Sequence, residues 1–308
     1  MSGMILAIQG ALGQGVLWGI MGLGVYLTFR ILDIADLSVD GTFALGGCTC
    51  AALMVRAGMD PYTSVILSSL AGMAAGFLTG ILYTKCGIPA ILAGILTQLG
   101  LYSINLRIMD KSNTPFLKVG TAFKQLAAGT GLSQNWCSLL IGGFVAALLI
   151  AALYWFFGTE MGSAIRATGN NENMARSQGM NTNHYKILGL ALSNGMVSLS
   201  GALVSQHQGY ADVKQGMGAI VTGLASIIIG EVVLGRRVNF AVKLAAVVAG
   251  SCIYRMIVAV VLQMGLSTDD LKLLTAALVA LALSVPVLLE KRRLAKRYCE
   301  AGEEEKHA

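Results

Sequence analysis

Charge is scarce in this sequence. Only 12% of its 308 residues are Asp, Glu, Lys or Arg, whereas an ordinary soluble domain carries about 25%. Hydrophobic residues make up 55% of the chain, and the mean hydropathy is +0.69. These values exclude a soluble protein, a nucleic-acid-binding protein and a disordered chain. The net charge of +6 does not change this, because the basic residues lie between apolar stretches and near the C-terminal end, where membrane orientation places them.

The uncharged stretches are long. Most of them reach the roughly 20 apolar residues that a helix needs to cross a bilayer. They do not alternate between apolar and polar residues, as the strands of a transmembrane barrel do. The sequence therefore predicts an all-α, polytopic transmembrane bundle of about 8–10 helices, because roughly 20 residues suffice for each crossing. The nine expected helices are 5–29, 41–55, 64–84, 88–106, 137–157, 187–205, 216–234, 238–264 and 271–289.

Two of these segments are too short for an ordinary crossing. At 1.5 Å per residue, 41–55 spans about 22 Å, less than a hydrocarbon core of about 30 Å. The uncharged stretch 215–230 is similarly short. Both contain glycine, which is typical of broken or re-entrant helices; a tilted ordinary helix is the alternative.

One internal similarity suggests a repeat. GIPAILAGI at 87–95 aligns with GMGAIVTGL at 216–224. In the expected topology the two segments run in opposite directions, as in an inverted-topology repeat. Chance recurrence of small residues is the alternative.

The basic residues predict the orientation. The tail around 291–297 carries five of them and is expected on the cytoplasmic side. Nine crossings then place the start of the chain outside, with 14 Lys and Arg inside against 7 outside. The first basic residue is Arg30, so the start does not match a signal peptide. The basic loop 107–124 fits the outside poorly, so a miscount of the crossings is the alternative to this topology.

We expect a transmembrane domain over 1–290 and a charged cytoplasmic tail over 291–308.

Catalytic and metal-binding patterns are missing. The six cysteines include a C-x-C pair, Cys48 and Cys50, that has no partner cluster, so packing is their expected role. A phosphate-binding loop of the form G-x-x-x-x-G-K-[ST] does not occur. Paired catalytic groups at membrane depth are not found either. The sequence predicts no catalytic residue, no metal site and no cofactor bound by this chain.

The longest polar stretch before the tail is 158–186. Within it, GNNENMARSQGM predicts a short helix, with Asn170 or Asn171 as its N-cap and Gly179 as a left-handed C-cap. Such a helix, lying parallel to the membrane, can dock into a groove on another protein; a solvated connector is the alternative. Its small apolar face would be formed by Ala167, Met174 and Ala175.

This loop resembles the coupling segment of ABC-importer permeases, in which an alanine and a glycine precede a short helix and a later glycine. LTFRILDIADLSVDGTFALGG at 27–47, IPAILAGILTQLGLYSINLRIM at 88–109 and GLASIIIGEVVLG at 223–235 extend the resemblance. Together they are similar to permeases of the branched-chain amino-acid and ribose type, and most of all to those of tryptophan/tyrosine-type systems. The resemblance covers nearly all of 5–290. The coupling residues that it implies are Ala167, Gly169, Asn170, Asn173, Ala175 and Gly179.

The resemblance also implies partners and a location. It implies a multi-pass protein of the cell membrane that forms a homodimer and transports an aromatic or other amino acid. A separate ATP-binding-cassette ATPase subunit would hold ATP and Mg²⁺, and an extracytoplasmic binding protein would deliver the solute. The alternative is a secondary transporter driven by an ion gradient, because broken helices and an inverted repeat fit it equally well.

Arg255 and three aspartates are polar groups at or near membrane depth. An ionisable residue inside the membrane is a functional candidate, so Arg255 is a candidate for the translocation path; snorkelling to the outer interface is the alternative. Asp33, Asp36 and Asp40 are expected to cap the next short helix, because aspartate favours helix N-termini. An ion site is the alternative for these aspartates, and Asp36 and Asp40 are also path candidates.

Asn105 and Arg107 end the helix expected over 88–106. Arginine can hold a carboxylate with two hydrogen bonds, so a role in amino-acid passage is one interpretation and interface anchoring the other. Glu231 is expected to form an ion pair, and Arg236 is near it in the sequence.

Overall fold

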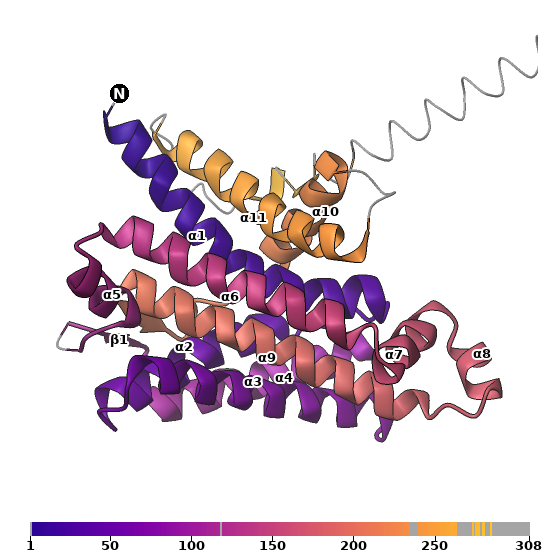
Figure 1. Ribbon diagram of the computed structural model, residues 1–308. Helices are drawn as coiled ribbons and strands as arrows, with labels where there is room; N and C mark the ends of the chain where they lie inside the picture. The colour runs from indigo at the N-terminus through magenta and orange to yellow at the C-terminus, as the bar shows by residue number, and fades with distance from the viewer. Residues whose placement is uncertain are drawn as a thin grey trace, which may run out of the picture.

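The computed structural model describes residues 2–117, 119–234 and 239–263, together with 273, 275–277, 279–280 and 284. The described chain is almost entirely helical, which confirms the all-α class (Figure 1). The first helix, α1 (Ser2–Tyr26), continues into a π-helical turn, η1 (Leu27–Ile31). The other helices are α2 (Val39–Val55), α3 (Pro61–Thr84), α4 (Ala90–Met109), α5 (Ala122–Thr130), α6 (Gln134–Phe156), α7 (Glu160–Asn170), α8 (Glu172–Ser177), α9 (Thr182–Gln208), α10 (Ala219–Leu234) and α11 (Phe240–Gln263).

Within the described residues, six helices are long and apolar enough to cross a membrane: α1 with η1, α3, α4, α6, α9 and α11. Two apolar helices, α2 and α10, are shorter. These eight elements match the first eight expected helices in order, so the expected transmembrane bundle is confirmed over the described residues. The ninth expected helix, 271–289, and the tail 291–308 lie largely or wholly outside the described residues.

The long helix α9 lies at the centre of the bundle, where it contacts α1, α2 and α3. Its serine hydroxyls donate hydrogen bonds to carbonyl oxygens of two neighbours. Ser193 and Ser200 donate to α1, each over 2.7 Å, and Ser198 donates to Ser68 of α3 over 2.6 Å. A bilayer core supplies no water, so these hydroxyls are satisfied within the protein and hold neighbouring helices together.

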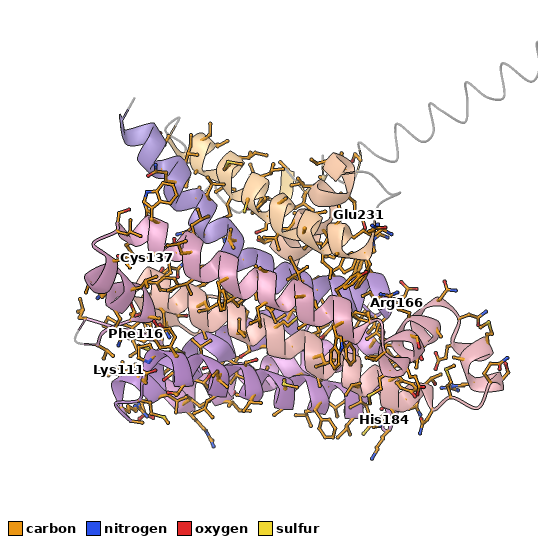
Figure 2. The ribbon with its side chains drawn as sticks, viewed as in Figure 1. Lys111, Phe116, Cys137, Arg166, His184 and Glu231 are labelled. Carbon is orange, nitrogen blue, oxygen red and sulfur yellow. The ribbon has the colours of Figure 1, made fainter. Side chains whose placement is uncertain are left out.

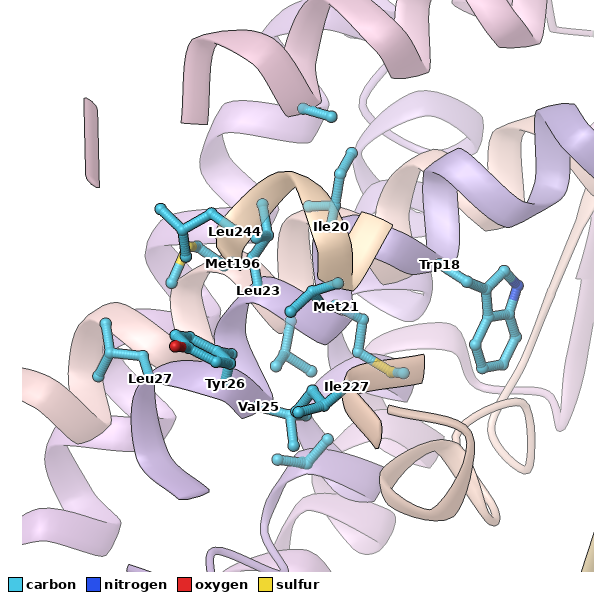
Figure 3. Packing of buried hydrophobic residues seen from close by; sticks show 14 of the residues in the cluster. Trp18, Ile20, Met21, Leu23, Val25, Tyr26, Leu27, Met196, Ile227 and Leu244 are labelled. Atoms are coloured by element: carbon cyan, nitrogen blue, oxygen red, sulfur yellow. The ribbon is translucent and has the colours of Figure 1, made fainter. Parts of the chain in front are cut away.

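The apolar core surrounds α1. Its residues from Leu17 to Leu27 are buried against α6, α9, α10 and α11. Figure 3 shows Ile20, Leu23 and Met21 of this helix beside Leu244 of α11 and Ile227 of α10. A helix enclosed on several sides needs no polar face, which explains why this segment is apolar all round.

The short helix α2 begins inside the bundle. Oγ of Ser38, its N-cap residue, lies 3.2 Å from Oδ1 of Asn194, close to the middle of the 27-residue helix α9. From there α2 runs parallel to α9, since Gly46 meets Ser198 and Gly47 meets Ser205. The expectation of a broken helix is therefore confirmed for this segment, which covers only part of the depth that α9 spans.

The aligned segments of the suspected repeat begin helices at matching positions, Ala90 of α4 and Ala219 of α10. The two helices run in opposite directions. The last residue of α4, Met109, accepts a hydrogen bond from Arg56 beyond the end of α2, whereas Glu231 near the end of α10 pairs with Arg30 of η1. This arrangement agrees with an inverted repeat.

The two ends of the bundle differ. At one end, called here the α7–α8 end, these two helices project beyond the long helices (Figure 1). At the other, called the strand end, β1 (Asn113–Pro115) pairs antiparallel with β2 (Tyr210–Asp212) beside α5. Figure 2 shows Arg166 and His184 at the α7–α8 end, and Lys111 and Phe116 at the strand end.

The contact between α2 and α9 predicts the effect of one methyl group. A Cβ at Gly46 would lie 1.9 Å from the carbonyl oxygen of Ser198, whereas a Cβ at Gly143 meets nothing within 4 Å. We expect Gly46→Ala to destabilise the purified protein by about 1–3 kcal/mol, the usual cost of overpacking. Gly143→Ala, the matched control, should unfold like the wild type. Thermal unfolding in detergent measures both, and equal midpoints would contradict this close contact.

Candidate functional site

Asp36 holds the start of α2 against the middle of α9. One carboxylate oxygen accepts hydrogen bonds from the backbone N–H of Ser38 (2.9 Å) and from its hydroxyl (2.6 Å). The other accepts from Nδ2 of Asn194 over 2.7 Å. All three side chains are buried. The expected capping of α2 by Asp36 is not found, because Asp36 binds the N-cap residue Ser38 rather than an N–H group of the first turn.

Asp40 caps a different helix from the one expected. Its carboxylate accepts hydrogen bonds from the backbone N–H groups of Gly218 and Ile220, each over 2.9 Å, at the start of α10. The first N–H groups of a helix have no partner within the helix, and inside a bilayer there is no water to replace one. Sequence proximity pointed to α2, but the fold brings the start of α10 to the first turn of α2.

Asp33 does not cap α2. It lies where the chain leaves η1, with a left-handed backbone (φ 55°). Nearby, Arg30 forms a two-pronged ion pair with Glu231, in which its Nε lies 2.8 Å from Oε1. The pairing expected for Glu231 is thus with a residue 201 positions away, and Arg236 lies outside the described residues. This pair joins η1 to α10.

Two of the predicted path residues share a cavity. Asp40 and Asn105 both line a hollow of about 120 Å³ between α2, α4 and the turn before α10. Asn105 is buried; its Nδ2 lies 3.4 Å from the carbonyl oxygen of Gly41, and its Oδ1 has no hydrogen-bond partner in the part of the chain that the structure describes. Asp36 lies four residues before Asp40, against α9, and does not line this hollow.

The two predicted path arginines lie elsewhere. Arg107 is exposed near the end of α4. The guanidinium of Arg255 lies over the ring of Trp18, 4.0 Å from its centroid, and its Nε has no hydrogen-bond partner among the described residues. A cation over an aromatic face is stabilised without a carboxylate. The structure therefore does not bring either arginine to the cavity of Asp40 and Asn105.

The polar stretch 158–186 holds two short helices, rather than one, before α9 begins at Thr182. The expected short helix is α8; Asn171 caps it by accepting a hydrogen bond from the N–H of Met174 (3.0 Å), and Gly179 adopts the left-handed conformation (φ 80°). Sequence analysis missed α7, which contains Ala167, Gly169 and Asn170. Thr159 begins α7, a signal that could have revealed it, because threonine is a favoured N-cap.

The predicted coupling residues range from buried to exposed, with Ala167 and Gly169 half-buried. Gly169 contacts η1 so closely that a Cβ would lie 1.9 Å from the carbonyl oxygen of Ile31. Ala175 is fully buried and Met174 is 54% exposed, so the small apolar face expected from Ala167, Met174 and Ala175 is split between the inside and the outside. The exposed members of the predicted set are Asn170, Asn173 and Gly179.

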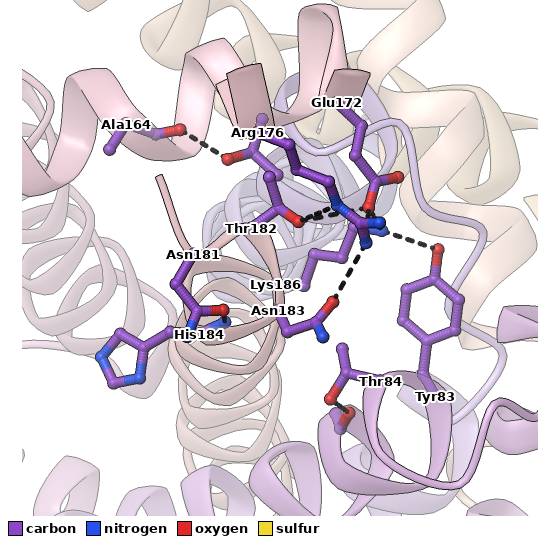
Figure 4. Close-up of polar contacts among 12 residues, drawn as sticks. Tyr83, Thr84, Ala164, Glu172, Arg176, Asn181, Thr182, Asn183, His184 and Lys186 are labelled. Atoms are coloured by element: carbon purple, nitrogen blue, oxygen red, sulfur yellow. Dashed lines mark hydrogen bonds and ion pairs between the residues drawn. The ribbon is translucent and has the colours of Figure 1, made fainter. Parts of the chain in front are cut away.

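Glu172 attaches α8 to α9. Figure 4 shows its carboxylate among Arg176, Thr182 and Lys186. Its Oε1 lies 2.7 Å from Nζ of Lys186 and 2.7 Å from Nη2 of Arg176, and it accepts a hydrogen bond from Thr182 over 3.3 Å. Lys186 is nearly buried and also donates to Tyr83 of α3. The hydrogen bond from Lys186 lowers the pKa of Glu172, against the opposing effect of its partial burial.

Arg166 attaches α7 to two further helices. Its guanidinium carbon lies 5.0 Å from the ring centroid of Phe157, just after α6, and 4.3 Å from that of Phe240, the first residue of α11. With Gly169 against η1 and Glu172 bound to α9, the α7–α8 pair contacts four of the elements that build the bundle. A force applied to this pair would therefore reach several transmembrane helices at once.

Comparison with known proteins defines the class of this fold. Residues 7–284 match the family described as the branched-chain amino acid transport system permease component. A tyrosine transport system permease protein of Clostridioides difficile is 38% identical over 91% of this chain and 90% of its own length. An autoinducer 2 import system permease protein of Photorhabdus laumondii is 28% identical over 70% of this chain and 61% of its own length.

The fold itself is that of an ABC transporter membrane subunit. A solved structure titled as an inward-facing conformation of a metal-chelate type ABC transporter superposes with a TM-score of 0.51 at 17% identity, covering 92% of this chain and 84% of that one. The protein is thus a multi-pass membrane permease and not itself a catalytic enzyme. It belongs to the branched-chain amino-acid transport system permease family.

The Glu172 contacts predict a pH-dependent contribution to stability. Because the pKa of this carboxyl is lowered in the fold, its stabilising effect is complete above the ordinary glutamate pKa of about 4.3 and is lost as the pH falls through the lowered value. We expect Glu172→Gln to lower the unfolding temperature near neutral pH, and the difference from the wild type to vanish in acid below the lowered pKa.

Thermal unfolding of both proteins over a pH series measures this effect. Glu160→Gln is the matched control, because Glu160 is exposed at the start of α7 and forms no ion pair among the described residues. A Glu172→Gln difference that stays constant down to the most acidic point would contradict the assignment to an ionised carboxylate.

Proposed function

We propose that this chain is the permease subunit of an ATP-driven importer of an amino acid. Two copies of the chain form the translocation path, and an extracytoplasmic binding protein delivers the solute. Family membership supports the class of protein, and the chain has no phosphate-binding loop of its own, so hydrolysis belongs to a partner ATPase that holds ATP and Mg²⁺.

The α7–α8 pair is the proposed docking site for the ATPase, and its attachment to the bundle is the observation that carries this assignment. The pair projects beyond the long helices (Figure 1) and presents Met174, Asn170 and Asn173 on its outside. A short helix with an exposed apolar side chain can insert into a groove on a partner. Its contacts with η1, α9, α6 and α11 would transmit the movement of that partner to the membrane helices.

The proposed orientation follows from the charges. An odd number of crossings separates the strand end from the tail 291–308 in the expected topology, so this basic tail and the α7–α8 end lie on the same side. Excess Lys and Arg marks the cytoplasmic side, which places the ATPase inside and leaves the strand end to the binding protein.

An aromatic amino acid is the proposed substrate. The C. difficile relative, named as a tyrosine transport permease, matches nearly the full length of both chains at 38% identity, whereas the autoinducer 2 permease matches less of either.

The test is ATP-dependent uptake of tyrosine and tryptophan into vesicles that contain this chain, its co-purifying ATPase and its binding protein. Uptake that follows an imposed ion gradient and needs no ATPase would overturn the proposal in favour of a secondary transporter.

Docking of the ATPase at α8 predicts the effect of charging Met174. Burial of a methionine side chain contributes about 1.5–3 kcal/mol, and 1.4 kcal/mol corresponds to a factor of about ten in affinity. We therefore expect Met174→Glu to lower ATPase affinity, and with it transport, by about tenfold or more, while the permease stays folded.

Quantitative co-purification of the ATPase measures this loss. Met59→Glu is the matched control, because Met59 is also exposed but lies between α2 and α3 at the strand end. Equal retention of the ATPase by the two variants would show that α8 is not its docking site.

A further inference from the structure

The cavity shared by Asp40 and Asn105 has features of a ligand site that translocation alone does not require. It lies where α2 and α10 begin inside the bundle, and its wall is completed by Gln98 and Tyr102 of α4 and by Lys214 and Met217 of the turn before α10. A hollow that carries a few polar side chains at the start of two broken helices is a place where a transported solute can pause.

Asn105 supplies an acceptor without a donor. Asn105 is 1% exposed and is one of the residues that line the hollow, and its buried Oδ1 has no hydrogen-bond partner among the described residues. Buried polar atoms are nearly always hydrogen-bonded, because leaving one unpaired costs free energy. A ligand that donates a hydrogen bond at this point would remove the cost.

Asp40 adds a second acceptor on the same wall. Each of its oxygens takes one backbone N–H from the start of α10, and an ionised carboxylate offers about four acceptor positions in all. The Asp40 carboxylate therefore still has acceptor positions that can take a hydrogen bond from a ligand. An ammonium group carries three N–H donors and a positive charge, which is enough for one hydrogen bond to each of Asp40 and Asn105.

Lys214 supplies the opposite charge. It is exposed at the rim of the same hollow, and its ammonium group can hold a carboxylate. Tyr102 and Met217 also line the hollow and are 44% and 63% exposed, so they offer apolar surface beside it. A volume of about 120 Å³ suits the charged head of an amino acid, with the side chain lying against this surface.

We propose that this cavity is a subsite for the zwitterionic head of an α-amino acid, whose ammonium group binds Asp40 and Asn105 and whose carboxylate binds Lys214. An apolar or aromatic side chain then packs on Tyr102 and Met217. This inference rests on the proposed function and adds a binding position within each permease chain, on the route from the strand end.

Direct binding to the permease alone, in lipid nanodiscs, tests the subsite. The probes are L-tyrosine, tyramine, which lacks the carboxylate, and 3-(4-hydroxyphenyl)propionate, which lacks the ammonium group. We expect saturable binding of L-tyrosine, and binding at least about tenfold weaker for each analogue, the factor that corresponds to the loss of one good polar contact.

The variants are Asn105→Ala and Lys214→Gln, which should each weaken L-tyrosine binding by about tenfold. Lys111→Gln is the matched control, because Lys111 is also exposed at the strand end but does not line the hollow. Lys214 is exposed, so its variant keeps the test valid even where Asn105→Ala fails to fold. Equal binding of the three probes, or wild-type binding by Lys214→Gln, would overturn the subsite.

ATP-dependent uptake by the complete importer separates this inference from the proposed function. Tyrosine uptake without saturable tyrosine binding to the permease would overturn the subsite and leave the importer proposal standing. Failure of ATP-dependent uptake for every amino acid would overturn the importer proposal itself, and the subsite with it.

Discussion

A helix that begins inside a membrane has backbone N–H groups that water cannot reach, and the centre of this fold is built around that constraint. Asp40 meets it for α10, and Asp36 fixes the start of α2 by binding its N-cap residue. Asp36 holds the start of α2 to Asn194 in the middle of α9, and Asp40, one turn later, accepts the first N–H groups of α10. Both broken helices are thereby fixed to each other and to the central helix.

The same constraint shapes the packing around α9. Its serines return hydrogen bonds to carbonyl oxygens of α1 and α3, and glycine at position 46 lets the α2 and α9 backbones approach each other. Because lipid is as apolar as leucine, burying apolar surface cannot by itself hold helices together in a bilayer. Close packing and internal hydrogen bonds replace it, and the outward faces of α3, α4 and α6 are left apolar.

Apart from Arg255 inside α11, the charges discussed above lie at the ends of the bundle and at the helix breaks, where they join segments far apart in the sequence. Glu172 ties the projecting α8 to Lys186 at the start of α9, and Glu231 ties α10 to Arg30 of η1. Arg166 reaches from α7 to aromatic rings next to α6 and α11. A partner that moves α7–α8 would thus act on helices that also position Asp36 and Asp40, which links the proposed docking site to the cavity between α2, α4 and α10.

The sequence by itself determined the apolar membrane helices of the described residues and the family, but not α5 or α7. Runs of uncharged residues mark transmembrane helices because the bilayer penalises charge wherever it occurs, and caps such as Asn171 act on residues only three positions away. The tertiary structure alone decided which helix Asp40 caps, which partner Glu231 takes and that Ala175 is buried. It also decided that Asn105 lines the cavity, whereas Arg107 and Arg255 do not. These outcomes depend on which distant segments meet in space, and a partner some 180 or 200 residues away leaves no periodic or local signal in one sequence.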